Sequence, residues 1–244
     1  MLNRINQKNY FKQLSHLLNS SILSMPDFIP DLNKFRQLAR ESLQDKLKVH
    51  ADNSEQLFTM ALALSAAIKK VFFERSEHKF SAEPNIEKRT IIQFVKRMRI
   101  DAMEKFNATT FLSAVHYYKD VAALKNNDPV GLIIVYIERT YVPEMLRLFK
   151  YPYIDYDNDD EVLDGIGAIC NLIAGYFKKE LARLGCIDLE MSHFRSAINT
   201  ALDGIEYCKT QTEKYEITFE IDGKKRMVVE MVMDPIPHKL NEDT

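Results

Sequence analysis

Residues 159–181 read DDEVLDGIGAICNLIAGYFKKEL, and this stretch decides the fold. Acidic residues crowd its start and two lysines, Lys178 and Lys179, lie near its end, an order that the helix macrodipole favours. The spacing predicts a helix from about Asp160 to Leu181. Apolar residues at helical spacing form its core-facing stripe: Ile166, Ile169, Cys170, Ile173 and Phe177.

A second face of this helix carries polar and small residues. Asp164, Ala168, Asn171 and Gly175 are spaced by four, three and four residues, so they lie nearly in line. Glycine inside a helix is less favourable than alanine by about 1 kcal/mol. The glycines at 165, 167 and 175 therefore suggest close approach by a partner or by another part of the chain. Tight packing of the helix on a sheet is the alternative interpretation.

The flanking sequence predicts a sheet around this helix. The run VGLIIVYI, residues 130–137, is the strongest strand signal, and Asp222-Gly223 is a favoured hairpin pair. The other predicted elements are a helix over 88–106, strands over 111–120 and 197–207, a short helix over 141–149, and hairpin strands over 215–221 and 226–233.

Residues 1–85 are predicted to be helices joined by short breaks. The clearest of these helices follows Asp52-Asn53-Ser54-Glu55, which supplies a capping residue and an acidic first turn. The polar segment 76–84 ends at a proline, and we place a domain boundary there. The sequence thus predicts an α+β fold: a helical N-terminal region, 1–85, before a domain, 86–244, whose antiparallel sheet carries long helices on one face.

Composition excludes several classes of function. The 244 residues are 46% hydrophobic with a formal net charge of −2, which gives no basic field for nucleic acid. The longest uncharged apolar stretch, Gln56–Ile68, is shorter than the ~20 residues of a membrane span, so no membrane insertion is expected. No secretory signal or metal-binding cysteine spacing is present, which favours a cytoplasmic protein. The six histidines are scattered and nucleotide-binding motifs are absent, so we expect no metal and no cofactor.

The run DGIGAICNLIAG, residues 164–175, with a strand and short helix before it and a hairpin after it, resembles the CheC/CheX family of chemotaxis phosphatases. The likeness covers roughly residues 88–235. In that family Asp or Ser, Glu and Asn recur at the spacing of positions 164, 168 and 171, and a Pro follows later. Asp164 and Asn171 match the pattern. The resemblance implies a CheX-like fold whose motif helix docks on a response-regulator receiver, where the Asn orients the attacking water.

Two positions depart from the family pattern. Ala168 replaces the catalytic Glu, and Phe194 replaces the Pro. Because alanine cannot hold the regulator's lysine, we expect phosphatase activity to be weakened or lost while binding survives. The resemblance then implies an interaction module of bacterial chemotaxis, flagellar or two-component signalling that binds a receiver or flagellar switch protein. The partner-binding residues would be Asp164, Gly167, Ala168, Asn171 and Gly175.

Two other functional hypotheses stay open. One is an active phospho-aspartate phosphatase with Asn171 and Asp164 as catalytic residues. The other is a scaffold whose N-terminal helices bind a partner. A strand edge could also support a homodimer, as in some family members.

Three further features have a functional and a plain interpretation. Glu104-Lys105-Phe106-Asn107 spells a second Glu-x-x-Asn pattern, but such a short pattern arises by chance. The acidic run 155–161 could steer a basic partner, or it could only cap the helix. His193 lies near the family's Pro position, where a solvated loop histidine is the better interpretation.

Overall fold

The structure, a computed structural model, describes residues 53–77, 80, 82–91, 105, 106, 108–198 and 213–239. The described residues all belong to one compact unit. Its helices are α3 (Asn53–Ser76), α4 (Val121–Lys125), η1 (Arg139–Tyr141), α5 (Val142–Leu148) and α6 (Asp159–Arg183). Its strands are β1 (Asn85–Thr90), β2 (Thr110–Tyr118), β3 (Gly131–Glu138), β4 (Glu190–Met191), β5 (Arg195–Ile198), β6 (Glu213–Ile221) and β7 (Lys224–Met233).

The strands form one antiparallel sheet in the order β1-β6-β7-β3-β2-β4, and β5 also pairs with β2. β3 is central, and its residue Ile134 lies opposite Ala114 on one side and Glu230 on the other. The β6–β7 turn has positive φ at Asp222 (52°) and Gly223 (70°), as a two-residue type I′ hairpin requires. The predicted hairpin is therefore confirmed.

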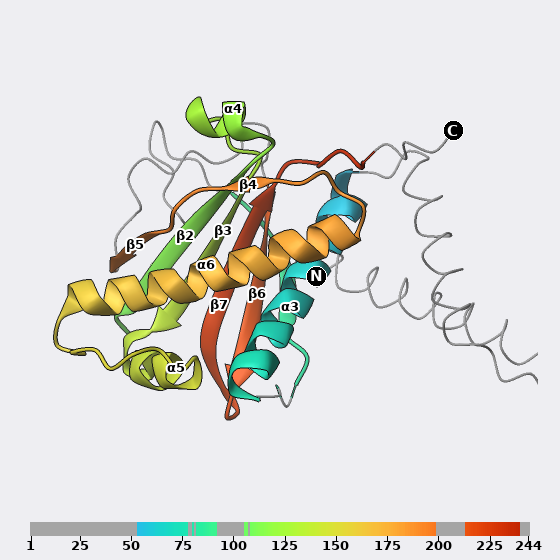
Figure 1. The fold of residues 1–244 in the computed structure, drawn as a ribbon. Coiled ribbons are helices and arrows are strands. Elements are labelled where there is room, and N and C mark those ends of the chain that lie inside the picture. The colour runs from blue at the N-terminus through green and yellow to red at the C-terminus, as the bar shows by residue number, and fades with distance from the viewer. Residues whose placement is uncertain are drawn as a thin grey trace, which may run out of the picture. The chain divides into compact units, whose positions relative to one another are not determined.

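Both long helices pack on one face of the sheet. Figure 1 shows α6 crossing the strands, with α3 beside it. Alternate residues of β3 point to this face: Ile133, Val135 and Ile137 join the core under the helices, whereas Leu132, Ile134 and Tyr136 belong to a smaller apolar cluster on the opposite face. The predicted α+β class, with an antiparallel sheet and long helices on one face, is confirmed.

Helix α3 belongs to the same body as the sheet. Its predicted apolar stripe is buried in the core shared with α6. This helix lies within the predicted N-terminal region, residues 1–85, and it packs with the sheet and α6. Among the described residues, Glu55–Ser76 is also long and apolar enough to cross a membrane. An 18-residue stretch of it has a mean hydropathy of 1.4, and 56% of that stretch is buried inside the protein. Core packing accounts for this hydropathy.

Two predicted elements need correction. The helix predicted over 88–106 begins instead as strand β1, because its backbone pairs with β6, where Lys88 lies opposite Tyr215 and Arg89 opposite Lys214. This pairing satisfies backbone groups of β6 that would otherwise lie at a bare edge. The strand predicted over 197–207 begins two residues earlier, as β5. Residues 92–104 and 199–212 lie outside the described residues.

Candidate functional site

Helix α6 positions the candidate site, and its ends are set by local chemistry. Asn158 is the N-cap, and its side chain accepts a hydrogen bond from the backbone N–H of Asp160 at 3.1 Å. Acidic residues fill the first turn and Arg183 lies in the last, so both ends agree with the macrodipole. The predicted helix, 160–181, is confirmed within these bounds.

The buried side of α6 is anchored on strand β2. The hydroxyl of Tyr117 donates to the carbonyl oxygen of Ala174 at 3.0 Å, and the thiol of Cys170 donates to the carbonyl of Ser113 at 3.3 Å. The ring of Phe177 packs edge-on against Tyr117. These contacts fix the rotation of α6, and therefore determine which of its residues reach solvent.

The opposite side of α6 carries the residues that the sequence singled out. Asp164 and Asn171 are exposed, and Ala168 and Gly175 are partly exposed. A Cβ atom added at Gly175 would meet no atom of the described residues within 4 Å, so their surface is open there. We call these four residues the Asn171 face. The helix thus brings them together on one accessible side.

Gly167 lies elsewhere, under the ring of Phe194. A Cβ atom at this position would come within 2.1 Å of the ring atoms Cδ2 and Cε2. Gly167 is one of the predicted partner-binding residues, but it is buried and presents no surface to a partner. The glycine leaves room for the Phe194 ring, so the group that approaches closely here belongs to this chain and not to a partner. Phe194 consequently borders the Asn171 face on this side.

Tyr151 lies on the other side of the face, and sequence reasoning missed it. Its hydroxyl donates to Asp164 Oδ2 at 2.9 Å. Its ring also lies near Gly165, where an added Cβ would be 3.5 Å from Tyr151 Cε1 and 2.8 Å from Leu146 Cδ2. The signal was faint, because Tyr151 only follows the predicted short helix and precedes an acidic loop. The side chain of Asp164, alone of the two polar side chains in the Asn171 face, is therefore held in place by Tyr151.

The Asn171 face offers a carboxylate, an amide and small residues, but no thiol, hydroxyl or imidazole. The described cysteines are buried, and burial raises the pKa of Cys170 to about 12 and that of Cys186 to about 11. Among the described residues no group of three or more His, Cys, Asp or Glu could hold a metal ion. Such a face can bind a partner or orient a water molecule.

The acidic run 155–161 mostly stabilises the start of α6. Asp159 pairs with Arg139 at 3.1 Å, and Glu161 accepts a hydrogen bond from the backbone N–H of Asp155 at 2.9 Å. Tyr153, within the same loop region, is 92% exposed. The role of this run in steering a partner stays a prediction.

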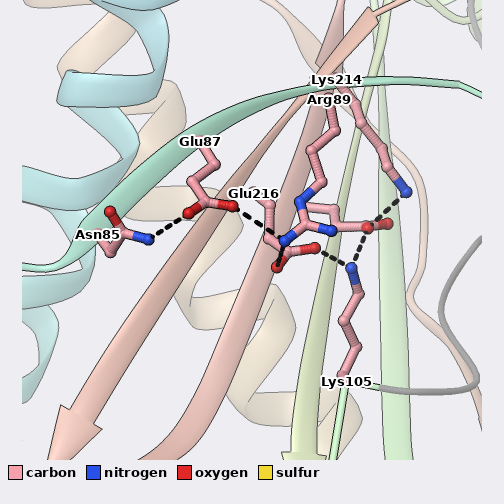
Figure 2. Close-up of polar contacts among 7 residues, drawn as sticks. Asn85, Glu87, Arg89, Lys105, Lys214 and Glu216 are labelled. Carbon is pink, nitrogen blue, oxygen red and sulfur yellow. Dashed lines mark hydrogen bonds and ion pairs between the residues drawn. The ribbon is translucent and has the colours of Figure 1, made fainter. Parts of the chain in front are cut away.

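The second Glu-x-x-Asn pattern does not form a comparable face. Glu104 and Asn107 lie outside the described residues, and Lys105 is buried on the sheet face opposite α6, next to Tyr136. Figure 2 shows its ammonium paired with the carboxylate of Glu216. The same ammonium lies 2.6 Å from Oε1 of Glu230. We call this cluster, with Lys214 and Arg89, the Lys105 network.

The Lys105 network sets three cations against two carboxylates. Lys214 pairs with Glu230 at 2.6 Å, Arg89 lies 3.3 Å from Glu216, and the Tyr136 hydroxyl donates to Glu230 at 2.9 Å. Each buried carboxylate therefore faces more than one donor, as buried charges require. The network joins β1, β6 and β7 to the start of β2, and we interpret it as structural.

The histidines also serve the structure where it describes them. His116 is buried on β2, and burial together with the charge of Arg195 lowers its pKa to about 4. His193 is exposed, in keeping with a solvated loop residue.

No known protein-family model matches the chain, and no curated protein matches its sequence. The chain is similar to solved structures of chemotaxis proteins. These include Thermotoga maritima FliY, with 13% identity over 76% of this chain and 92% of that one at a TM-score of 0.48, and CheX from Desulfovibrio desulfuricans, with 13% identity over 72% and 99% at 0.46. A third is the CheX–CheY–BeF3–Mg complex of Borrelia burgdorferi, with 11% identity over 72% and 97% at 0.45.

Proposed function

We propose that this protein is an interaction module of bacterial chemotaxis, flagellar or two-component signalling, which docks through the Asn171 face on a response-regulator receiver or a flagellar switch protein. The observation that carries the proposal is the exposure of Asp164 and Asn171 on one side of α6, beside the open surface at Gly175. These are the residues that resemble the CheC/CheX motif. The protein would act in the cytoplasm.

The same face argues for binding with weak or absent hydrolysis. Hydrolysis of a phospho-aspartate depends on positioning and electrostatics, to which the family contributes an amide and a glutamate. Here the glutamate position is Ala168, whose methyl group carries no charge. Asp164 lies one turn away and is tied to Tyr151, so it reaches a different point on a partner. Shape complementarity can persist without the glutamate.

Binding to purified receiver domains activated with beryllofluoride tests the proposal. We expect the wild-type protein to bind at least one receiver of a panel, and Asn171→Arg to abolish that binding by placing a bulky charge at the centre of the face. Asn126→Arg is the matched control, since Asn126 is an exposed asparagine at the end of α4. Binding that survives Asn171→Arg would sink the proposal.

An active phosphatase is the second candidate, because Asn171 and an oriented Asp164 share the exposed face. The rate of receiver dephosphorylation separates the two. If wild type accelerates phosphate loss and Asn171→Ala does not, the protein is an enzyme that dispenses with the family glutamate. If wild type is inert and Ala168→Glu gains activity, the protein is a binder on a phosphatase-like fold.

A further inference from the structure

We propose that Tyr151 is a positioning residue, whose hydroxyl holds the Asp164 carboxylate ready to bind a lysine or arginine side chain of the docked partner. The proposal rests on the proposed function, because it names the chemical group that the Asn171 face would recognise. Beyond the proposed function, it gives a role to Tyr151 of this chain and names a lysine or arginine side chain as the group of the partner.

The end of α5 places Tyr151 against α6. Lys150 has a φ of 53°, and the backbone N–H of Tyr151 donates to the carbonyl of Leu146 at 3.0 Å, a pattern that closes a helix C-terminus. Gly165 leaves room for Leu146 and for the Tyr151 ring. The tyrosine is therefore fixed by its own backbone and by α6 before any partner arrives.

The hydrogen bond orients Asp164 without cancelling its charge. A tyrosine hydroxyl is a neutral donor, so the exposed carboxylate keeps its negative charge at the surface. Asp159 differs, because Arg139 already pairs with it at 3.1 Å. Burial and the hydrogen bond to Asp164 raise the pKa of Tyr151, so its hydroxyl stays protonated at neutral pH.

An oriented carboxylate is a ready acceptor for a cationic side chain. Charge-assisted hydrogen bonds between a carboxylate and lysine or arginine are stronger than neutral ones, and a group that is already held loses less rotamer freedom on binding. Asp164 and Asn171 are two helical turns apart, roughly 10 Å along the axis at 1.5 Å per residue. The partner's cation would therefore lie about that distance from the group that meets Asn171.

A double-mutant cycle on the beryllofluoride-activated receiver tests the positioning role. We expect Tyr151→Phe, which keeps the ring, to weaken binding roughly threefold to tenfold, as the loss of one hydrogen bond does. Asp164→Asn should weaken binding further and flatten its dependence on salt. In the Asp164→Asn protein, Tyr151→Phe should then have no effect. A Tyr151→Phe effect that persists in that background would show a merely structural role and overturn the proposal.

Tyr153→Phe is the matched control, because Tyr153 lies two residues further along and is 92% exposed. It should leave binding unchanged, and a loss equal to that of Tyr151→Phe would overturn the assignment to Tyr151. Carbodiimide coupling of the complex followed by mass spectrometry should join Asp164 to a lysine of the receiver if the cation is lysine. Removal of that lysine should then weaken binding to wild type but not to Asp164→Asn.

A readout without the partner separates this inference from the proposed function. Ultraviolet or NMR titration should show a lower Tyr151 pKa in Asp164→Asn than in wild type, because the carboxylate helps to raise it. An unchanged pKa would overturn the positioning role, whatever the protein binds. A lowered pKa with no binding to any receiver would instead refute the proposed function, and with it the cation, while the Tyr151–Asp164 pair would stand.

Discussion

Alanine substitutions at two glycines of α6, Gly167 and Gly175, measure how tightly the candidate site is packed. Gly167 lies under the ring of Phe194, where an added Cβ would approach ring atoms to 2.1 Å, whereas Gly175 has no atom within 4 Å of the same position. Neither glycine has a positive φ, so alanine fits the backbone at both. Gly175→Ala should therefore stabilise the protein by about 1 kcal/mol, the helix propensity difference.

Gly167→Ala gains the same propensity term but must displace Phe194. Overpacking of this kind is destabilising by about 1–3 kcal/mol. Because the propensity term is common to both variants, their difference in free energy of unfolding should equal the overpacking term, about 1–3 kcal/mol. Urea denaturation of the two proteins measures this difference directly.

Repeating both glycine substitutions in a Phe194→Ala protein checks that the Phe194 ring causes the difference. When the ring is removed, Gly167→Ala should stabilise the protein as Gly175→Ala does. Equal free energies of unfolding for Gly167→Ala and Gly175→Ala in the wild-type background would refute the placement of Phe194 on α6.

Three further predictions concern the core and can be checked by denaturation. Lys105→Met should lower the free energy of unfolding by about 1.5–3 kcal/mol, because Glu216 and Glu230 each lose one of their two cationic partners, and a smaller loss would mean that water reaches the network. His116 has its pKa lowered from 6.5 to about 4, so the unfolded chain binds the extra proton first. The contribution of His116 to the free energy of unfolding is therefore largest above pH 6.5 and falls by about 3 kcal/mol as the pH drops to 4. His116→Gln should remove this dependence on pH. Phe177→Ala should lower the free energy of unfolding by about 3–5 kcal/mol, since the ring is fully buried, and the midpoint in urea should fall accordingly.

Sequence reasoning located those elements whose signals are local. The 3.6-residue periodicity of α6, the β-branched run of β3 and the Asp222-Gly223 turn each lie within one short segment, and each was found. The last three residues of β1, 88–90, were predicted as the start of a helix, because the pairing partner of this strand, β6, is more than a hundred residues away. Local propensity gives way to such pairing.

In the candidate site too, local features could be predicted from the sequence and contacts between separate elements could not. The four residues of the Asn171 face follow from helical spacing alone. The contacts that border them, Tyr151 on Asp164 and Phe194 on Gly167, join separate elements, and no spacing rule connects these pairs. The glycines did mark close approaches, at Gly165 and Gly167, but the sequence could not say that the approaching groups belong to this chain.

The strand order has a consequence for how the protein is made. The second neighbour of the central strand β3 is β7, where Ile134 lies opposite Glu230. Strand β1 pairs with β6, which also comes late in the chain. During synthesis the apolar strand β3 therefore emerges long before the hairpin that covers its open edge. Such nonlocal pairing slows folding and leaves an edge that other chains can join. A nascent or truncated chain without the last hairpin is thus the form that chaperones must protect from aggregation.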